Sequence, residues 1–290
     1  MTGNLRSILA MLAAMASFSL MDAVLKTLAG VYPTMQVAAL RGLTALPLVC
    51  VYVAWRRETH LLLRVRWPLH LLRGVIGIAM LGLFTYSLKE LGMAEAYTIF
   101  FVAPLIITVL SVPLLKERVS VRHWLAIGVG LGGVIVALRP DQDAFFSLGA
   151  IAVLGAAVFY AVSSIAGRIL SRTDASVALV FWTTAMWAVG ATLLAWPNWV
   201  PVSAAHGWVL LALAVTGFLG QLAITEAFRH GKASAVAPFE YSALAWAILL
   251  DYAIWHTVPD RYTLLGATII IASGIYLIRK EQVRDVTVAP

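Results

Sequence analysis

The segment Leu81–Gly128, LGLFTYSLKELGMAEAYTIFFVAPLIITVLSVPLLKERVSVRHWLAIG, resembles the segment Leu219–Gly266, LGQLAITEAFRHGKASAVAPFEYSALAWAILLDYAIWHTVPDRYTLLG. A shift of 138 positions places Leu81 on Leu219, Gly82 on Gly220, Phe101 on Phe239 and Gly128 on Gly266. In both segments an apolar run ends in a short polar link, and a second apolar run with aromatic residues follows. Internal similarity of this kind predicts a chain built from two related halves.

The composition predicts an integral membrane protein. Hydrophobic residues make up 61% of the 290 positions and charged residues only 12%, whereas a typical soluble domain has about 25% charged residues. The net charge of +7 comes from basic residues that lie between apolar runs, where they orient helices in a bilayer. We therefore expect a lipid bilayer, and no nucleic acid, as a partner. The single cysteine, Cys50, excludes an intrachain disulfide.

Ten apolar runs have the length of membrane-spanning helices. A helix needs about 20 apolar residues to cross the hydrocarbon core, and it satisfies its own backbone hydrogen bonds there. The first run carries Asp22 and Lys26 near its far end, so we interpret it as an uncleaved helix and not as a signal peptide. The predicted helices are Ser7–Leu28, Pro33–Trp55, Leu69–Leu88, Ala94–Leu115, Trp124–Leu138, Phe145–Ile169, Ala175–Trp196, Trp208–Phe228, Ala233–Trp255 and Tyr262–Ile278.

The distribution of Lys and Arg predicts the orientation. Of the 21 basic residues, 16 fall on the side of the N-terminus, four fall on the other side, and Arg41 lies within the second helix. Basic loops face the cytoplasm, so both termini are predicted to be cytoplasmic.

The loop Arg139–Asp143 divides the chain into two halves of five helices, residues 1–140 and 141–290. Because five is odd, the second half enters the membrane from the opposite side, and inverted repeats of this kind are typical of secondary transporters. The predicted fold is an all-α integral membrane protein with ten transmembrane helices, arranged as two inverted five-helix repeats around a central cavity. The short loops leave no room for a separate soluble domain.

Enzyme chemistry has no visible motif. Gly128, Gly130 and Gly133 formally match the dinucleotide fingerprint, but that motif needs a strand before it, and these glycines lie inside a predicted helix. The spacing of Gly128 and Gly132 instead favours close helix packing in lipid. We expect no enzymatic activity, no cofactor and no bound metal.

Charged residues at membrane depth cost about 2.5–3.5 kcal/mol each on insertion scales, so they mark a pathway or a paired site. Arg41 lies roughly 12 Å below the outer boundary, at 1.5 Å per residue. It is predicted either to pair with a carboxylate on another helix or to contact an anionic substrate group. Gly42 beside it allows a neighbouring helix to come close in both cases.

Three further charged residues lie toward the outer side. Asp22 and Lys26 are four residues apart, so they share one face of the first helix and are able to pair. Glu95 is a candidate partner for Arg41 or Lys26, although a carboxylate in the first turn is also favoured by the helix dipole. These residues are candidates for gating or coupling.

On the inner side, Glu240 follows Pro238 at a depth of roughly 10 Å in the ninth helix. Because desolvation raises the pKa of a carboxyl group, Glu240 is a candidate for proton coupling, and a structural, hydrogen-bonded acid is the alternative. Gln221 in the eighth helix could bond either substrate or a neighbouring backbone. Aromatic residues away from the membrane boundaries could line a cavity, since small-molecule sites are mostly apolar with a few polar groups.

The ten short-looped helices and the two halves resemble the drug/metabolite transporter superfamily, and specifically its EamA-type ten-helix exporters. The resemblance rests on Ala103–Pro104, Leu114–Glu117 and Gly128, and on Ala237–Tyr241, Val258–Pro259 and Gly266. It implies alternating access, export from the cytoplasm and a bacterial inner-membrane location. The second half lacks an acidic residue that matches Glu117.

The inner aromatic residues further resemble exporters of aromatic and other neutral amino acids, and a proton-coupled exporter of drugs or other amphipathic compounds is the alternative. One chain contains both repeats, so a monomer is sufficient and a dimer is compatible. The predicted substrate-binding residues are Gln36, Arg41, Tyr86, Tyr97, Phe101, Ser164, Trp182, Trp187, Gln221 and Tyr241, and the predicted coupling or gating residues are Asp22, Lys26, Glu95 and Glu240.

Overall fold

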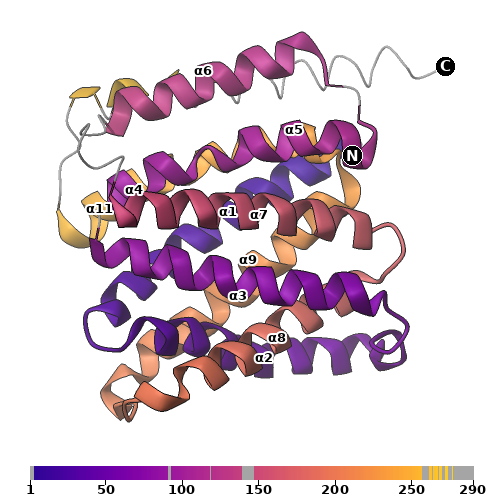
Figure 1. The fold of residues 1–290 in the computed structure, drawn as a ribbon, viewed down its shortest axis with the longest axis vertical. Coiled ribbons are helices and arrows are strands. Elements are labelled where there is room, and N and C mark those ends of the chain that lie inside the picture. The colour runs from indigo at the N-terminus through magenta and orange to yellow at the C-terminus, as the bar shows by residue number, and fades with distance from the viewer. Residues whose placement is uncertain are drawn as a thin grey trace.

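A computed structural model describes residues 3–90, 93–117, 119–138 and 147–256, together with separate positions from 261 to 276. The described part of the chain is helical and contains no strand (Figure 1). Its α-helices are α1 Gly3–Ala29, α2 Thr34–Arg56, α3 Trp67–Glu90, α4 Met93–Phe100, α5 Ala103–Leu115, α6 Val121–Leu138, α7 Leu148–Leu170, α8 Ser176–Ala195, α9 Gly207–His230, α10 Ala233–Val236 and α11 Ser242–Trp255.

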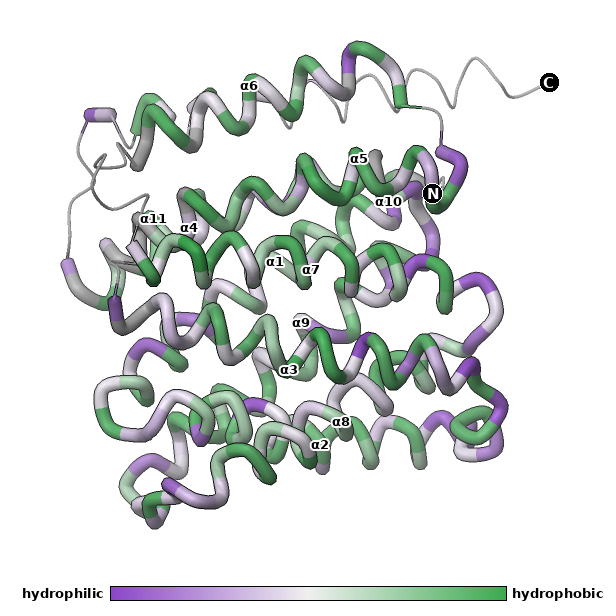
Figure 2. Tube along the Cα trace, viewed as in Figure 1, coloured by the Kyte–Doolittle hydropathy of each residue, from purple (hydrophilic) through white to green (hydrophobic). Residues whose placement is uncertain are grey.

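The long apolar runs of the sequence become long helices. Six helical segments among the described residues are long and apolar enough to cross a membrane, and Ala103–Leu115 and Trp124–Gly133 are shorter apolar helices. Figure 2 shows hydrophobic residues through the middle of the bundle and hydrophilic residues concentrated toward its two ends. The predicted all-α membrane fold is thereby confirmed. The predicted loop Arg139–Asp143 and eight of the 17 positions of the predicted helix Tyr262–Ile278 lie outside the described residues.

Two predicted continuous helices are broken. The predicted helix Ala94–Leu115 ends at Phe100, and α5 begins at Ala103, next to Pro104. The predicted helix Ala233–Trp255 contains the 3-10 segment η5, Ala237–Tyr241, between α10 and α11. In both cases the break falls at an Ala-Pro pair, because proline lacks the N–H that a continuing helix requires. Hydrophobicity alone did not reveal these breaks.

The packing of the helices relates the two halves. Helix α1 packs on α9, and α3 packs on α7, so the first helix of each half contacts the third helix of the other. Helix α2 packs on α8, which is the second helix of the second half, and the two run side by side in Figure 1. These pairings are those of a pseudo-twofold arrangement, in which each half covers the apolar face of the other.

Gly42 permits the close approach of α2 and α8. A Cβ atom at this position would lie 2.5 Å from the backbone nitrogen of Ala188. Small residues at a helix contact let two backbones come near each other in lipid, as expected from the sequence. The glycines of α6 behave differently: among the described residues nothing lies within 4 Å of a Cβ built at Gly128 or Gly132, whereas one at Gly130 would meet Tyr241.

A buried carboxylate fastens the link between α7 and α8 to the start of α3. Asp174 accepts hydrogen bonds from the backbone N–H of Arg66 at 3.1 Å, from His70 Nε2 at 2.9 Å and from the Thr173 hydroxyl at 2.7 Å. Burial alone would raise the pKa of the Asp174 carboxyl, but these hydrogen bonds outweigh it and hold the pKa below its ordinary value. The ionised carboxylate therefore stabilises the contact between the halves.

We predict that Asp174→Asn lowers the melting temperature and removes part of its acid dependence. A depressed carboxyl pKa stabilises the fold above the unfolded value of about 3.9, and this stabilisation is lost as the pH falls through the folded pKa. Loss of the charge-assisted hydrogen bonds should lower the free energy of unfolding by about 1–3 kcal/mol near neutral pH. Melting in detergent from pH 3 to 7 measures both effects, and identical pH profiles for the two proteins would contradict the assignment.

Candidate functional site

A cavity of about 150 Å³ lies where the two halves meet. Helices α1, α2, α3, α4, α7, α8 and α9 and the segment η5 all contribute to its wall. Most of the lining is apolar, with a small number of charged and polar groups, which is the usual composition of a small-molecule site. The charged and polar side chains in the wall are Ser19, Asp22, Arg41, Arg73, Thr85, Tyr97, Tyr160, Ser163, Ser164, Trp187, Gln221 and Glu240.

Asp22 and Arg41 both contribute charged groups to the wall of the cavity. The Tyr97 hydroxyl donates a hydrogen bond to Asp22 Oδ2. Arg41 is electrostatically coupled to the Asp22 carboxylate. Both groups line the cavity, so the cost of bringing each charge into the membrane is reduced by the other.

Aromatic rings hold the Arg41 guanidinium in place. Its central carbon lies 4.9 Å from the centre of the Trp187 ring and 5.5 Å from that of Phe18. These are cation–π distances, and the attraction is stronger away from water. Arg41 is therefore positioned in the wall by aromatic faces, and it needs no second carboxylate to stay there.

A second carboxyl group faces the cavity from the other half. Glu240, in η5, interacts with the Tyr160 hydroxyl of α7, and Ser164 lies beside the same hydroxyl. In the first half Asp22 and Tyr97 belong to the first and fourth predicted helices, and Tyr160 and Glu240 belong to the first and fourth predicted helices of the second half. Each half thus contributes one carboxyl–tyrosine contact, with the two residue types exchanged.

Several polar atoms of the cavity wall lack a protein partner. Among the described residues, Arg73 Nε, Trp187 Nε1, Gln221 Nε2 and Glu240 Oε1 are buried and make no hydrogen bond. Buried polar atoms are nearly always paired, so each exception requires an explanation. All four of these side chains contribute to the lining of one cavity.

A row of aromatic rings forms the apolar wall. Phe84 lies 5.2 Å from Phe100 and 6.0 Å from Tyr97, measured between ring centres. Tyr97 lies 5.8 Å from Phe101, and Phe100 lies 5.4 Å from Tyr160. The break between α4 and α5 places Phe101 and Pro104 in this wall, so both broken helices present their irregular segment to the cavity. Irregular backbone at membrane depth is tolerated where it lines such a cavity.

The structure brings eight of the predicted site residues to the cavity. They are Asp22, Arg41, Tyr97, Phe101, Ser164, Trp187, Gln221 and Glu240. Lys26 is exposed and lies outside the lining. Glu95 belongs to α4, but its side chain lies outside the described residues.

Four other predicted binding residues lie away from the cavity. Gln36 exchanges hydrogen bonds of 2.6 and 2.9 Å with the backbone of Val200, so it joins α2 to the segment after α8. Tyr86 is 39% exposed on the outside of α3. Trp182 donates to the Leu62 carbonyl at 2.8 Å, near the end of the bundle. Tyr241 is buried against Phe101. For these residues the sequence could not tell which helix face lines the cavity and which packs against a neighbouring segment or faces outward.

The cavity also contains residues that sequence reasoning did not select. Arg73 is one of the 16 basic residues counted on the side of the N-terminus, and it stands six residues inside α3. Tyr160, Phe84 and Phe18 were recognised at most as aromatic residues of a helix. Depth within a helix was the one available signal for Arg73, since about six residues correspond to roughly 9 Å. Among the described residues no three His, Cys, Asp or Glu side chains come together as a metal site.

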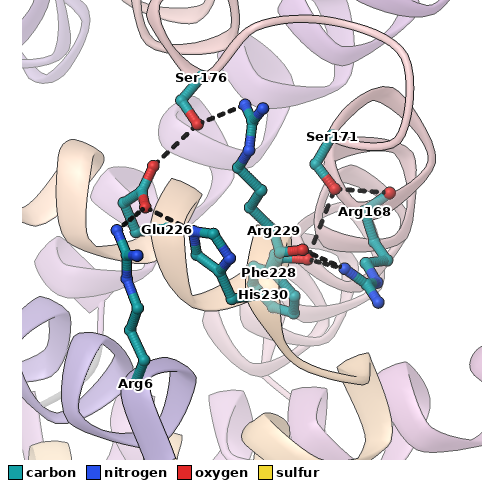
Figure 3. Close-up of polar contacts among 8 residues, drawn as sticks. All are labelled: Arg6, Arg168, Ser171, Ser176, Glu226, Phe228, Arg229 and His230. Atoms are coloured by element: carbon teal, nitrogen blue, oxygen red, sulfur yellow. Dashed lines mark hydrogen bonds and ion pairs between the residues drawn. The ribbon is translucent and has the colours of Figure 1, made fainter. Parts of the chain in front are cut away.

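The end of the bundle that holds the N-terminus is closed by a polar network (Figure 3). The Glu226 carboxylate of α9 accepts hydrogen bonds from Arg6 of α1 at 3.1 Å and from Ser176 of α8 at 2.8 Å. It also contacts His230 Nε2 at 2.9 Å. Arg168 of α7 donates to the carbonyl oxygens of Phe228 and Arg229 at 2.6 and 2.7 Å. The network therefore ties together helices from both halves.

Apolar packing lies between this network and the cavity. Along α1 the cavity lining begins at Met15 and continues to Ala29. Ile8 and Met11, one to two turns earlier, are buried in the hydrophobic core with Ile165 and Phe228. The cavity is thus sealed at the end predicted to face the cytoplasm.

A membrane bundle of two packed halves around a polar, aromatic-lined cavity defines the class of membrane transporters. The sequence pattern of the EamA-like transporter family matches residues 5–139 and again residues 147–279. The chain belongs to this family, and it is a transporter and not an enzyme.

The chain is similar to several named transporters. It is 30% identical over 276 residues to the pseudopaline exporter CntI of Pseudomonas aeruginosa, covering 94% of this chain and 96% of the relative. It is 28% identical to the riboflavin transporter of Vibrio cholerae, over 86% of this chain and 84% of that protein. It is also 28% identical to the S-adenosylmethionine uptake transporter of Rickettsia conorii, over 73% of this chain and 72% of that protein. A solved crystal structure superposes with a TM-score of 0.77 at 22% identity, covering 92% of this chain and 94% of the other, which supports the shared fold alone.

We predict that Glu226→Gln opens the sealed end more often. The change weakens the contacts with Arg6 and His230, and losing about 1 kcal/mol of closed-state stabilisation raises the open population about fivefold. In a Cys50→Ser background that carries Met11→Cys, the rate of labelling by a membrane-impermeant maleimide added from the N-terminal side measures this opening.

A matched control is Glu58→Gln, which breaks the surface pair with Arg56 at 2.9 Å on the same side of the membrane. This pair joins no two long helices, so its loss should leave the labelling rate of Met11→Cys unchanged. Equal labelling rates for Glu226→Gln and the parent protein would show that the network does not hold this end closed.

Proposed function

We propose that the chain exports amino acids, aromatic and other neutral ones, or related small metabolites from the cytoplasm by alternating access. The observation that carries this proposal is the presence of the Asp22 carboxyl group and the Arg41 guanidinium together in the wall of an aromatic-lined cavity. A zwitterion offers an ammonium group to the carboxylate and a carboxylate to the guanidinium, and charge-assisted hydrogen bonds of this kind are strong. The aromatic wall of Phe84, Phe100 and Phe101 then receives the side chain.

The proposed orientation places both termini in the cytoplasm of a bacterial cell, with the protein in the inner membrane. The contacts support one common side for the basic segments, because Arg6 meets Glu226 and Arg66 meets Asp174 at the same end of the bundle. Basic loops favour the cytoplasm. The relatives include both exporters and uptake transporters by name, so the outward direction of transport is part of the proposal.

The proposed moving parts are the two repeats, residues 1–140 and 141–290. The double match of the family pattern supports this division. Residues of both repeats line the cavity, so a relative movement of the repeats changes access to it. One chain supplies the complete wall, and a monomer is the proposed functional unit.

Counterflow in liposomes tests the proposal. Purified protein is reconstituted, the vesicles are loaded with unlabelled phenylalanine, and entry of labelled phenylalanine, tryptophan or threonine is measured with and without a pH gradient. We expect saturable entry that unlabelled neutral amino acids inhibit. Entry no faster than in protein-free vesicles, for all three compounds, would refute amino-acid transport.

We predict that Trp187→Ala lowers counterflow of phenylalanine more than that of threonine. The change removes a ring that lines the cavity and holds Arg41, and loss of aromatic contact should cost roughly 0.5–1.5 kcal/mol, or about two- to tenfold in apparent affinity. Trp182→Ala is the matched control, because Trp182 lies outside the cavity and bonds Leu62. The same loss for both substrates in Trp187→Ala would argue against an aromatic subsite.

A second candidate function is the proton-coupled export of drugs or other amphipathic compounds. The observation that favours it is Glu240, a buried carboxyl group in the cavity wall with Oε1 unpaired. A carboxyl group in such a place can take up a proton on one side and release it on the other.

We predict that Glu240→Gln removes the response of transport to a pH gradient, if protons are coupled at this site. The glutamine keeps the shape of the side chain but cannot exchange a proton. The comparison uses the flux in the presence of an inward-acidic gradient divided by the flux without one. A ratio that is the same in the variant and the parent protein excludes Glu240 as the coupling group.

A further inference from the structure

Arg73 is a buried cation of the cavity wall that forms no ion pair with any residue the structure describes. It is 9% exposed, and its NH1 donates to the Thr183 hydroxyl at 2.8 Å. Its guanidinium passes 3.4 Å from the position that a Cβ would take at Gly167. His70 and Tyr160 are neighbouring ionisable groups. Among the described residues no carboxylate lies within 4 Å of Arg73, and its Nε makes no hydrogen bond.

The guanidinium groups of Arg41 and Arg73 therefore have different surroundings. Arg41 is coupled to Asp22 and covered by the faces of Trp187 and Phe18. A neutral amino acid placed on Asp22 and Arg41 leaves Arg73 with no anion. A buried charge without a partner is strongly unfavourable, so an anion at Arg73 would be stabilised by more than an ordinary surface contact.

The two arginines lie at different depths, one nearer each end of the bundle. Arg41 is seven residues from the start of α2, and Arg73 is six residues from the start of α3 at the other end of the bundle. At 1.5 Å per residue in a hydrocarbon core of about 30 Å, their backbones are separated by roughly 10 Å along the membrane normal. Both line the same cavity, so one extended small molecule can reach both.

We propose that Arg73 forms a second anion subsite, which binds a carboxylate on the side chain of the substrate. The preferred substrates are then amino-acid-like compounds with a carboxylate at each end, the amino end meeting Asp22 and Arg41. Thr183 orients the guanidinium from α8, and the Arg73 side chain contributes to the lining of the cavity. This inference rests on the proposed function, and it extends the substrates of the same cavity from neutral amino acids to related compounds with an acidic side chain.

Acid and amide pairs test the subsite, because they differ in charge and hardly in shape. Counterflow is measured for glutamate and glutamine, and for 2-aminoadipate and its side-chain amide, with the ratio of maximal rate to half-saturation concentration as the readout. In the parent protein this ratio should favour at least one acid over its amide by about tenfold, the value that one charge-assisted contact of about 1.4 kcal/mol produces.

Arg73→Gln should bring the acid-to-amide preference close to one, and Arg73→Lys should keep part of it, because lysine retains the charge without the planar fork. If Arg73→Gln does not fold, Arg73→Lys and Thr183→Val carry the test, and each should reduce the preference at least about threefold. Arg172→Gln is the control, since this exposed arginine follows α7 outside the cavity, and it should leave the preference unchanged.

The outcomes separate the two proposals. Transport of neutral amino acids with no acid preference, or with a preference that all Arg73 and Thr183 variants retain, overturns the second subsite and leaves the proposed function in place. Absence of counterflow for every amino acid, acidic and neutral, overturns both. An acid preference that is lost in Arg73→Gln and kept in Arg172→Gln supports the subsite.

Discussion

The cost of a charge in the hydrocarbon core governs this structure. Asp22, Arg41, Arg73 and Glu240 all belong to predominantly apolar segments, and all four line one cavity. In lipid each charge would be expensive, but on the inner faces of the helices it meets a tyrosine, a threonine, an aromatic face or an opposite charge. The two halves must therefore enclose these residues together, and the cavity between the halves is the consequence.

The broken helices serve the same constraint. At Pro104 and Pro238 the regular helix stops, and the backbone that would be unsatisfied in lipid lies in the protein interior. The 3-10 segment Ala237–Tyr241 holds Glu240 at the cavity and Tyr241 against Gly130. A continuous helix would have changed which side each of these residues faces. The Ala-Pro pair in each half is thus a positional element of the site.

The two ends of the bundle have different construction. At the end with the N-terminus, Glu226 and Arg168 bond across helices above a tightly packed core of Ile8, Met11 and Phe228. At the other end Gln36 of α2 and Tyr32 of the link between α1 and α2 bond to the segment after α8, while the cavity lining runs to the last residue of α1. This asymmetry is consistent with one arrangement of an alternating-access cycle, in which the repeats reorganise while the charged cavity between them is kept.

The sequence by itself determined the membrane class, the helical fold and the two related halves, because these depend on hydropathy and spacing, which are local. The sequence also singled out six residues that the structure places in the cavity wall, because a charge, an amide or a large aromatic within an apolar run is conspicuous in the sequence itself. These residues are Asp22, Arg41, Tyr97, Trp187, Gln221 and Glu240. Only the tertiary structure decided that Gln36, Tyr86, Trp182 and Tyr241 lie outside the cavity, and that Arg73 and Tyr160 lie in its wall. The reason is geometric: in helices with apolar residues on every side, hydropathy does not say which face turns inward, and that choice is made by the helices that pack against it.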